Sequence, residues 1–356
     1  MNKLVVLGGG YGGLRAVQKL LAEKGIQDLS ILLIEKEPYH SLKTEFYALA
    51  AGTVSDQELR VHFPNDVRLE LKFAKIESID LDKKLVHLES EEPVDYDDLI
   101  IGLGCEDRYH GVPGADQHTL SIQSMRRARK TYQVLQGVKA NGRVAIVGGG
   151  LSGVELASEL RESRPDLEIL LFDRNAKILS SFPDKLSDYV TEWFEKNQVK
   201  LMTKANITEV ERYRIYNHDD PIDVDTTIWT AGIQASKIVR DLPVDQDGIG
   251  RLITTDHHHI PGNDSVFVIG DCAASEFAPS AQLAEAQAER TVKLLAKKWR
   301  GEAFPEEMPK IKLKGVLGSL GKKQGFGYMR DKPMTGRVPR VLKSGVLWMY
   351  KFGSHS

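Results

Sequence analysis

The sequence predicts an α/β fold made of two similar units, because one glycine pattern occurs twice. The pattern Gly-x-Gly-x-x-Gly spans residues 8–13 as GGGYGG and residues 148–153 as GGGLSG. Each copy directly follows a short apolar run. About twenty residues after each copy, a second apolar run ends in an acid, Glu35 or Asp173. A strand, a glycine turn, a helix and a second strand form the repeating unit of a parallel α/β sheet.

The spacing of the glycines indicates what each unit can bind. The first glycine permits a sharp turn, the second lets the backbone approach a pyrophosphate, and the third packs the helix against the strand. The pyrophosphate then lies at a helix N-terminus, where unpaired N–H groups and the helix dipole favour negative charge. The acid completes the unit by accepting a hydrogen bond from an adenosine ribose, so two dinucleotides are expected on one chain. The six glycines are Gly8, Gly10, Gly13, Gly148, Gly150 and Gly153.

Composition and cysteine usage exclude several classes of protein. The 356 residues suit two or three domains, with 41% hydrophobic and 28% charged residues, as in ordinary globular proteins. Cys105 and Cys272 form no Cys-x-x-Cys pair, which argues against a disulfide framework and a redox-active dithiol. This cysteine usage fits an intracellular setting. No apolar stretch reaches about eighteen residues, so we expect no membrane-spanning helix. The run His257–His259 is expected to be a solvated loop, and no metal site is predicted.

Charge is distributed unevenly along the chain. The net charge is −2, but eleven Lys or Arg residues face one acid from Lys310 onward, so this last segment carries +10 and the rest −12. Residues 337–352 place Arg340, Lys343 and Lys351 on one helical side and apolar residues on another. This pattern predicts a basic amphipathic helix on an anionic membrane surface. The alternative is packing on the protein or on a second subunit, so a homodimer is left open; no nucleic-acid partner is expected.

The second unit is expected to lie inside the first. The two repeats cover residues 2–36 and 143–174. A later apolar run at residues 265–269 reads as the last strand of the first unit and leads into Gly-Asp at 270–271. A helix over about residues 280–300 follows this turn. The arrangement is therefore nested.

Eight stretches together carry a resemblance to a known group of proteins. They are GGGYGGL at 8–14, YH at 39–40, LAAGT at 49–53, LIIGLG at 99–104, GGGLSGVELASEL at 148–160, WTAGI at 229–233, VIGDCA at 268–273 and AQLA at 281–284. With them the chain resembles the two-dinucleotide-binding-domain flavoproteins and, among these, the type II NADH dehydrogenases. The AQLA stretch and the Lys-Gly pair at 314–315 point to the dehydrogenase branch.

The resemblance implies tandem Rossmann-like dinucleotide-binding domains, with the NAD domain inserted in the FAD domain and a short C-terminal segment after them. The FAD-binding domain would be discontinuous, covering residues 1–108 and 246–309. The NAD(P)H-binding domain would cover residues 109–245, and a basic amphipathic segment residues 310–356.

In the FAD domain, Asp271 can accept a hydrogen bond from a ribityl hydroxyl, because Gly270 ends a buried strand where the backbone approaches a ligand. The helix that starts near Ala281 would direct its positive end at the flavin pyrimidine and stabilise the charge of the reduced ring. The resemblance implies these FAD-binding residues: Gly8, Gly10, Gly13, Glu35, Thr44, Gly102, Asp271, Ala281 and Gln282.

In the NAD domain, Asp173 would hold the adenosine ribose, and its charge would repel a 2′-phosphate. Arg174 could attract that phosphate instead, but NADH is favoured over NADPH. Glu155 matches the family's GVEL stretch and would face the nicotinamide ribose; alternatively it only complements the helix dipole. The resemblance implies these NADH-binding residues: Gly148, Gly150, Gly153, Glu155, Asp173 and Gly232.

The resemblance also implies a quinone, such as menaquinone, as the electron acceptor. Ala281 and Ala284 would let a flat ring approach the flavin, or serve helix packing alone. Gln282 would hydrogen-bond a quinone carbonyl or the flavin. Lys314 matches a family lysine near the quinone head group, or is simply a solvated residue. With Glu155, the residues Gln282 and Lys314 are the candidate catalytic residues.

The sequence therefore predicts an FAD-dependent NADH dehydrogenase, peripheral on the cytoplasmic side of the membrane, that reduces a quinone. One departure keeps alternatives open: the family pattern A-Q-x-A-x-Q has Ala286 at its sixth position, and the glutamine follows as Gln287. The alternatives are a soluble NAD(P)H reductase with a non-quinone acceptor, and a flavoprotein that senses NADH or redox state with slow turnover.

Overall fold

Two compact units make up the protein, and each is assembled from three separate stretches of chain. The computed structural model describes residues 2–23, 26, 29–330 and 332–352. Unit 1 comprises Met1–Ser41, Arg60–Glu106 and Ile233–Leu313, and unit 2 comprises Leu42–Leu59, Asp107–Gly232 and Lys314–Ser356. The predicted α/β class is confirmed, since both units contain a parallel sheet with helices. The predicted domain boundaries stay a prediction; in the structure, residues 42–59 and the stretch from 314 group with the second glycine loop.

Unit 1 is built on a six-stranded sheet with the order β20-β21-β9-β1-β2-β5. All neighbours run parallel except β20, which pairs antiparallel with β21. The central strands are apolar and buried, as strands covered on both faces are. The strands are β1 (Asn2–Leu7), β2 (Leu29–Glu35), β5 (Leu69–Phe73), β9 (Asp98–Ile101), β20 (His259–Ile260) and β21 (Asn263–Val268).

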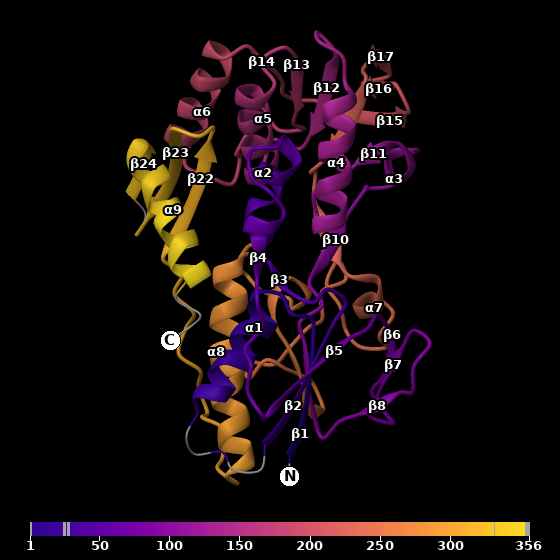
Figure 1. The fold of residues 1–356 in the computed structure, drawn as a ribbon, viewed down its shortest axis with the longest axis vertical. Coiled ribbons are helices and arrows are strands. Elements are labelled where there is room, and N and C mark those ends of the chain that lie inside the picture. The colour runs from indigo at the N-terminus through magenta and orange to yellow at the C-terminus, as the bar shows by residue number, and fades with distance from the viewer. Residues whose placement is uncertain (1, 24–25, 27–28, 331, 353–356) are drawn as a thin grey trace. The chain divides into compact units, whose positions relative to one another are not determined.

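Two helices cover one face of this sheet, and a small antiparallel sheet covers the other. The helices α1 and α8 lie side by side (Figure 1) and bury Leu14, Val17 and Leu295 against the strands. On the opposite face, Val86 and Val239 pack against the strands. The elements are α1 (Tyr11–Ala22), α8 (Ala281–Trp299), β6 (Ile76–Asp80), β7 (Leu85–Leu88), β8 (Val94–Asp95) and α7 (Lys237–Arg240).

The start of α8 confirms the predicted helix after the Gly-Asp turn. Ser280 is its N-cap, and the Ser280 hydroxyl accepts a hydrogen bond of 3.2 Å from the Leu283 N–H. Such a cap satisfies one of the N–H groups that have no partner inside the helix.

Unit 2 repeats the plan with a five-stranded parallel sheet, in the order β11-β18-β12-β13-β14. One face packs against an antiparallel sheet through Val210 and Ile215, which contact Val147 and Phe172 in one core. The helix α2 packs on α4 and on α5. The strands are β11 (Thr119–Leu120), β12 (Arg143–Val147), β13 (Glu168–Phe172), β14 (Val199–Met202), β15 (Ile207–Glu211), β16 (Arg214–Asn217), β17 (Asp220–Asp223) and β18 (Thr226–Trp229). The helices are α2 (Phe46–Ala51), α4 (Met125–Gly137), α5 (Leu151–Ser163) and α6 (Asp184–Lys196).

The last stretch of unit 2 is a three-stranded antiparallel sheet followed by a helix. These elements are β22 (Gly315–Leu320), β23 (Gln324–Met329), β24 (Lys332–Gly336) and α9 (Arg337–Phe352). The helix α9 packs on all three strands, and β22 packs on α5. The short elements of the chain are β3 (His40–Ser41), β4 (Arg60–Val61), β10 (Cys105–Asp107), β19 (Ile233–Ala235), η1 (Lys43–Glu45), η2 (Gln57–Leu59), η3 (Gly270–Cys272) and α3 (Ala115–His118).

Within the described part of the chain, no helix is both long and apolar enough to cross a membrane. Nor do three or more His, Cys, Asp or Glu side chains of those residues gather where a metal ion could bind. The expectation of a solvated histidine loop is wrong for His258, which is only 7% exposed; burial lowers its pKa to about 4. The neighbouring His257 places Nε2 at 2.8 Å from the Pro305 carbonyl oxygen.

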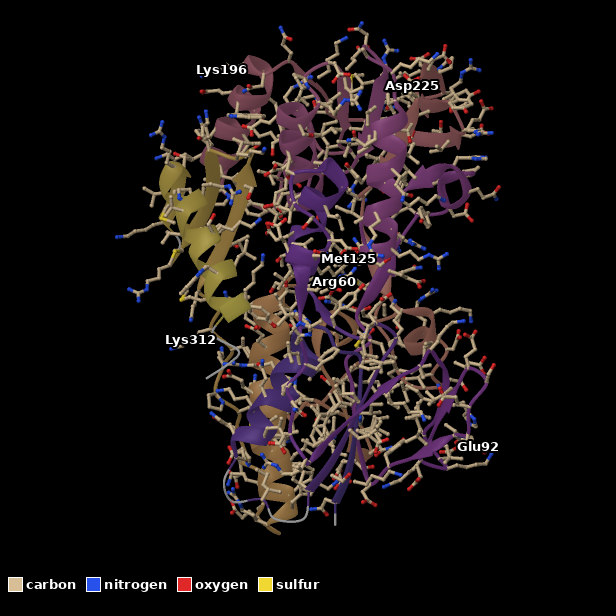
Figure 2. The ribbon with its side chains drawn as sticks, in the orientation of Figure 1. Arg60, Glu92, Met125, Lys196, Asp225 and Lys312 are labelled. Atoms are coloured by element: carbon tan, nitrogen blue, oxygen red, sulfur yellow. The ribbon has the colours of Figure 1, made fainter. Side chains whose placement is uncertain are left out.

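We expect Asp98→Ala to destabilise unit 1 by about 2 kcal/mol, because it removes a buried acceptor and leaves two partly buried donors without a partner. The Asp98 carboxylate, 4% exposed, accepts hydrogen bonds from Lys298 Nζ at 2.8 Å and from Trp299 Nε1 at 2.7 Å. Urea unfolding followed by circular dichroism measures the change. The control is Glu92→Ala, at an exposed position after β7 (Figure 2), which should shift stability by less than about 0.5 kcal/mol. Equal effects of the two substitutions would contradict the stabilising role of Asp98 as the acceptor for Lys298 and Trp299.

Candidate functional site

The first glycine loop joins β1 to α1 through contacts that admit no side chain. Gly8 has φ +93° and donates a 2.9 Å hydrogen bond to the Ile34 carbonyl. A Cβ on Gly13 would lie 1.9 Å from the Gly8 carbonyl oxygen, so α1 approaches β1 more closely than any other residue allows. The N-terminus of α1 therefore lies directly beyond the end of β1.

The same loop leaves room on its outer side. Gly10 is the N-cap of α1, and no described atom, its own chain neighbours aside, lies within 4 Å of a Cβ built on it. Beside it, Glu35 Oε2 accepts a 2.6 Å hydrogen bond from the Gly9 N–H, and Glu35 Oε1 accepts one from the Lys36 N–H at 2.8 Å. Open backbone at a helix N-terminus, with an acid at its rim, fits a pyrophosphate and its ribose.

The second glycine loop, between β12 and α5, has the same geometry. Gly148 has φ +112° and donates to the Phe172 carbonyl at 2.8 Å, and a Cβ on Gly153 would lie 1.8 Å from the Gly148 carbonyl oxygen. Around Gly150, as around Gly10, no described atom beyond its chain neighbours lies within 4 Å of a built Cβ. Asp173 Oδ2 accepts from the Gly149 N–H at 2.8 Å. Each unit thus contains one loop whose geometry fits a dinucleotide, and we call this loop with its acid the cradle of that unit.

In unit 1, the carboxyl ends of three parallel strands meet at the first loop. A Cβ on Gly8 would lie 2.5 Å from the Gly102 carbonyl oxygen, and the Gly102 N–H donates to the Leu7 carbonyl at 2.8 Å. Beyond β21, the helix η3 carries Asp271, whose Oδ2 accepts a hydrogen bond from Cys105 Sγ at 3.1 Å. Ligands of open α/β sheets bind at this edge, where neighbouring strands lead to opposite sides. The structure thus brings together Gly8, Gly102 and Asp271 of the predicted FAD site.

Gln287 has a role that its place in the sequence did not reveal. Its Oε1 accepts a 2.7 Å hydrogen bond from the Gly270 N–H, and its side chain is only 2% exposed. Gly270 has φ +76°, and a Cβ on it would lie 3.5 Å from Ala284 Cβ. The glutamine that departs from the family pattern therefore fixes the Gly-Asp turn against α8. Ala281 and Gln282 form the first turn of the same helix.

His40 is a second residue that sequence reasoning left without a role, although the Tyr-His pair was noted. His40 Nδ1 lies 2.8 Å from the Gly9 carbonyl oxygen, and its ring stands edge-on to Tyr11 at a centroid distance of 4.9 Å. Burial lowers the pKa of His40 to about 4, against the smaller raising effect of the Gly9 carbonyl. The neutral imidazole therefore donates from Nδ1 and supports the backbone of the glycine loop.

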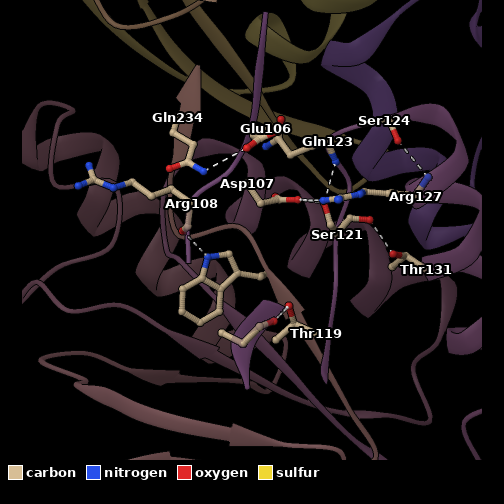
Figure 3. Close-up of polar contacts among 12 residues, drawn as sticks. Glu106, Asp107, Arg108, Thr119, Ser121, Gln123, Ser124, Arg127, Thr131 and Gln234 are labelled. Carbon is tan, nitrogen blue, oxygen red and sulfur yellow. Dashed lines mark hydrogen bonds and ion pairs between the residues drawn. The ribbon is translucent and has the colours of Figure 1, made fainter. Parts of the chain in front are cut away.

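In unit 2, hydrogen bonds hold the loop that contains Gly232. Trp229 Nε1 donates to the Arg108 carbonyl at 2.9 Å (Figure 3). The Arg108 N–H in turn donates to the Gly232 carbonyl at 3.1 Å. Asp107 accepts a 2.6 Å hydrogen bond from the Ser121 hydroxyl and pairs with Arg127. The loop after β18 is thus fixed at the carboxyl end of its strand, beside the second glycine loop.

Glu155 lies in the second turn of α5 and is bound to the C-terminal stretch of its own unit. Its Oε1 accepts hydrogen bonds from the Ser319 N–H at 2.8 Å and from Lys343 Nζ at 2.5 Å, and the residue is 4% exposed. Its role at a nicotinamide ribose stays a prediction. The expectation that Lys343 belongs to an exposed basic face of the C-terminal helix is wrong, because Lys343 is 7% exposed.

Two predicted site residues belong to unit 2 rather than to the unit that carries the first glycine loop. Thr44 lies in η1, and Lys314 is an exposed residue directly before β22. Their roles toward FAD and a quinone stay predictions.

The two cysteines differ in accessibility. Cys272 is fully buried, and burial raises its thiol pKa to about 12, whereas Cys105 is partly exposed. Cys272 therefore stays a neutral thiol at ordinary pH and is a poor nucleophile.

Comparison with known proteins agrees with this geometry. Residues 2–288 match the family described as pyridine nucleotide-disulphide oxidoreductase. NADH dehydrogenase-like protein YutJ of Bacillus subtilis (strain 168) is 60% identical over 351 residues, covering 99% of each chain. The type II NADH:quinone oxidoreductase of Staphylococcus haemolyticus is 27% identical and covers 96% of this chain and 93% of its own length.

Solved structures share the fold at lower identity. NDH2 from Plasmodium falciparum in complex with NADH superposes with a TM-score of 0.83 at 16% identity, covering 99% of this chain and 95% of that one. The sulfide:quinone oxidoreductase from Aquifex aeolicus gives a TM-score of 0.85 at 18% identity, covering 99% and 92%. These likenesses establish the fold and nothing further.

We expect Gly150→Ala to weaken NADH binding at least about tenfold while leaving folding and FAD content intact, because its methyl enters only the space left for the pyrophosphate. Gly153→Ala should instead impair folding of unit 2, since its Cβ would meet the Gly148 carbonyl. Titration of NADH, with circular dichroism and flavin absorbance, distinguishes the two effects. Gly137→Ala, at the exposed end of α4, is the control. Unchanged NADH affinity in Gly150→Ala would contradict the prediction that the second glycine loop binds the pyrophosphate of NADH.

Proposed function

The chain belongs to the pyridine nucleotide-disulphide oxidoreductase family, and from this premise we propose that it passes electrons from NADH through FAD to a quinone at a membrane surface. That it is an NADH-dependent oxidoreductase resembling NADH dehydrogenases follows from its family and its relatives. The observation that carries the proposal is the pair of matching cradles, one in each unit. FAD and NADH are the cofactors that the family implies.

In the proposed assignment, unit 1 holds FAD and unit 2 holds NADH. Gly10 at the N-terminus of α1, Glu35 and Asp271 would hold the pyrophosphate, a ribose and the ribityl chain of FAD. Gly150 and Asp173 would hold the pyrophosphate and adenosine ribose of NADH. When bound, these cofactors supply a hydride transfer from nicotinamide C4 to flavin N5, which requires no acid or base from the protein. The residues of the chain therefore bind and orient the two cofactors.

The environment of Asp173 supports NADH over NADPH. Its two oxygens accept hydrogen bonds from the backbone N–H groups of Gly149 and Asn175, at 2.8 and 2.7 Å. These bonds hold the carboxylate in place. In the proposed assignment it lies beside the adenosine ribose, where its charge would repel a 2′-phosphate.

A quinone is the proposed acceptor because the curated relatives at 26–27% identity are type II NADH:quinone oxidoreductases over almost their whole length. Gln282 at the start of α8 and Lys314 before β22 are the proposed quinone contacts. One observation favours a different acceptor. Ala286 stands where the resemblance expects a glutamine, and the side chain of Gln287 already accepts a hydrogen bond from the Gly270 N–H.

The outer face of α9 supports docking on an anionic leaflet. Its exposed apolar side chains include Val341, Trp348 and Met349, with exposures of 58–68%. The same stretch of chain also carries exposed basic residues: Lys322, Lys323, Arg330, Lys332 and Arg337. Each Lys or Arg near an anionic surface contributes roughly 1 kcal/mol, and apolar side chains that enter the lipid add to this. We place the enzyme peripherally on the cytoplasmic face of the membrane.

We expect NADH to bleach the purified yellow protein in stopped-flow mixing, with NADPH about tenfold slower because of Asp173. Menadione should then restore the colour rapidly.

Lys314→Ala should slow this reoxidation about tenfold, since the proposed contact to the quinone is lost. Lys312→Ala (Lys312 is labelled in Figure 2) is the matched control, because it removes an exposed lysine two positions earlier. Bleaching without reoxidation would reject the quinone and retain both cofactor sites.

We expect the protein to co-sediment with vesicles that contain phosphatidylglycerol and not with pure phosphatidylcholine, and high salt should weaken the binding. The double substitution Val341→Ser/Trp348→Ser should lower the vesicle-bound fraction about tenfold, because it removes apolar area from the docking face. The control is Val67→Ser, which changes a fully exposed valine of unit 1. Equal binding of both variants would place the membrane contact elsewhere.

A further inference from the structure

Neither cysteine has a part in the proposed electron transfer, yet both thiols lie at the Gly-Asp turn of unit 1. Cys272 directly follows Asp271, and its Sγ lies 3.3 Å from the Ile269 carbonyl oxygen. Cys105, 166 positions before Asp271, donates a hydrogen bond from Sγ to Asp271 Oδ2 at 3.1 Å. The two thiols therefore contact the turn differently: Cys272 contacts its backbone, and Cys105 contacts the carboxylate.

The backbone of the turn is held by groups other than Cys105. The Gly270 N–H donates to Gln287 Oε1 at 2.7 Å, and the Gly270 carbonyl accepts a hydrogen bond from the Ala273 N–H at 3.0 Å. The short helix η3, which contains the turn, also packs on α8 and on β19. Removal of the Cys105 thiol should therefore leave the path of the chain at Asp271 unchanged.

The strand β10, on which Cys105 lies, is also anchored within unit 1. The next side chain, Glu106, pairs with Arg240 at the end of α7 and accepts a hydrogen bond of 3.2 Å from Gln234 Nε2 on β19 (Figure 3). Both partners of the thiol–carboxylate contact thus start from anchored backbone. What this contact determines is the orientation of the Asp271 side chain.

The orientation of this side chain matters for binding a ligand. Asp271 is only half-buried, and an aspartate side chain has several staggered orientations from which a ligand must select one. A carboxylate has about four acceptor positions, so the single S–H of Cys105 leaves capacity for a ribityl hydroxyl. An S–H is a weak donor, but a hydrogen bond to a charged acceptor is stronger than one to a neutral acceptor. The thiol therefore lowers the conformational cost of binding and does not displace the ligand.

We propose that Cys105 is a positioning residue for FAD, and that its thiol holds the Asp271 carboxylate in the orientation that accepts a hydrogen bond from the ribityl chain. This role rests on the proposed function, because it takes FAD as the ligand of unit 1. Cys105 acts through Asp271 and need not touch the flavin. The role requires no change in the oxidation state of the thiol, in agreement with the lack of a Cys-x-x-Cys pair in the sequence.

The first test measures how fast FAD leaves the diluted holoprotein, followed by the rise in flavin fluorescence. Cys105→Ala should speed this release about fivefold, because the Asp271 carboxylate loses its donor. Cys105→Ser keeps a hydroxyl donor of similar size and should restore most of the wild-type retention. The control is Ser78→Ala, at an exposed position on β6 of the same unit, and it should release FAD at the wild-type rate.

Two outcomes of this test separate the positioning role from the proposed function. A wild-type protein that retains FAD, with an unchanged release rate in Cys105→Ala, would overturn the positioning role and leave the proposed function intact. A wild-type protein that binds no FAD would reject the proposed function, and the positioning role with it.

A double-mutant cycle tests whether Cys105 acts through Asp271. Asp271→Ala removes the acceptor, so adding Cys105→Ala to it should not speed FAD release any further. A fivefold effect of Cys105→Ala in both backgrounds would assign the thiol to general packing and contradict the proposal.

Infrared spectroscopy of the S–H stretching band reports the same contact without depending on FAD affinity. The Cys105 band is identified by its loss in Cys105→Ala. It should lie at lower frequency than the band of a thiol that has no acceptor, and it should move to higher frequency in Asp271→Ala, since a donated hydrogen bond weakens the S–H bond. The same band position in the wild-type protein and in Asp271→Ala would contradict the thiol–carboxylate hydrogen bond.

Discussion

Both units depend on a backbone contact that only glycine permits, in which the carbonyl of the first loop glycine lies against the α-carbon of the third. A side chain at Gly13 or Gly153 would begin less than 2 Å from that oxygen. The contact turns the chain from strand to helix within a few residues. It thereby places the helix N-terminus, the open backbone and the acid of the next strand at one point. The chemistry of each unit follows from this single approach.

The two glycine loops and their acids could be predicted from the sequence, because they depend on residues close together in the chain. Gly8 and Gly148 have the positive φ values that their turns require. Glu35 and Asp173 close their loops by accepting hydrogen bonds from the N–H groups of Gly9 and Gly149. The pattern repeats at fixed spacing, so the two parallel sheets could be predicted as well. Gly270 also has the conformation that its place after a buried strand demands.

The features that sequence reasoning missed arise from contacts between distant parts of the chain. Lys343 and Glu155 are 188 positions apart, and no helical periodicity reveals that a lysine will point inward. The amide of Gln287 reaches Gly270 from the facing helix, a position that the family pattern does not predict. The burial of His258 likewise depends on neighbours outside its own turn. In each case a polar group is buried because a partner from elsewhere satisfies it.

The interleaving of the units also governs the order in which the protein can form during synthesis. Strand β9 lies between β1 and β21 in one sheet, and its apolar residues are fully buried there. The ribosome releases β1 and β9 early, whereas β21 emerges only after the parallel strands of unit 2. Throughout that interval the nascent chain carries an apolar strand with one edge unpaired. Such an edge can pair with another chain and aggregate, and the sheet of unit 1 can be completed only after Val268 has been made.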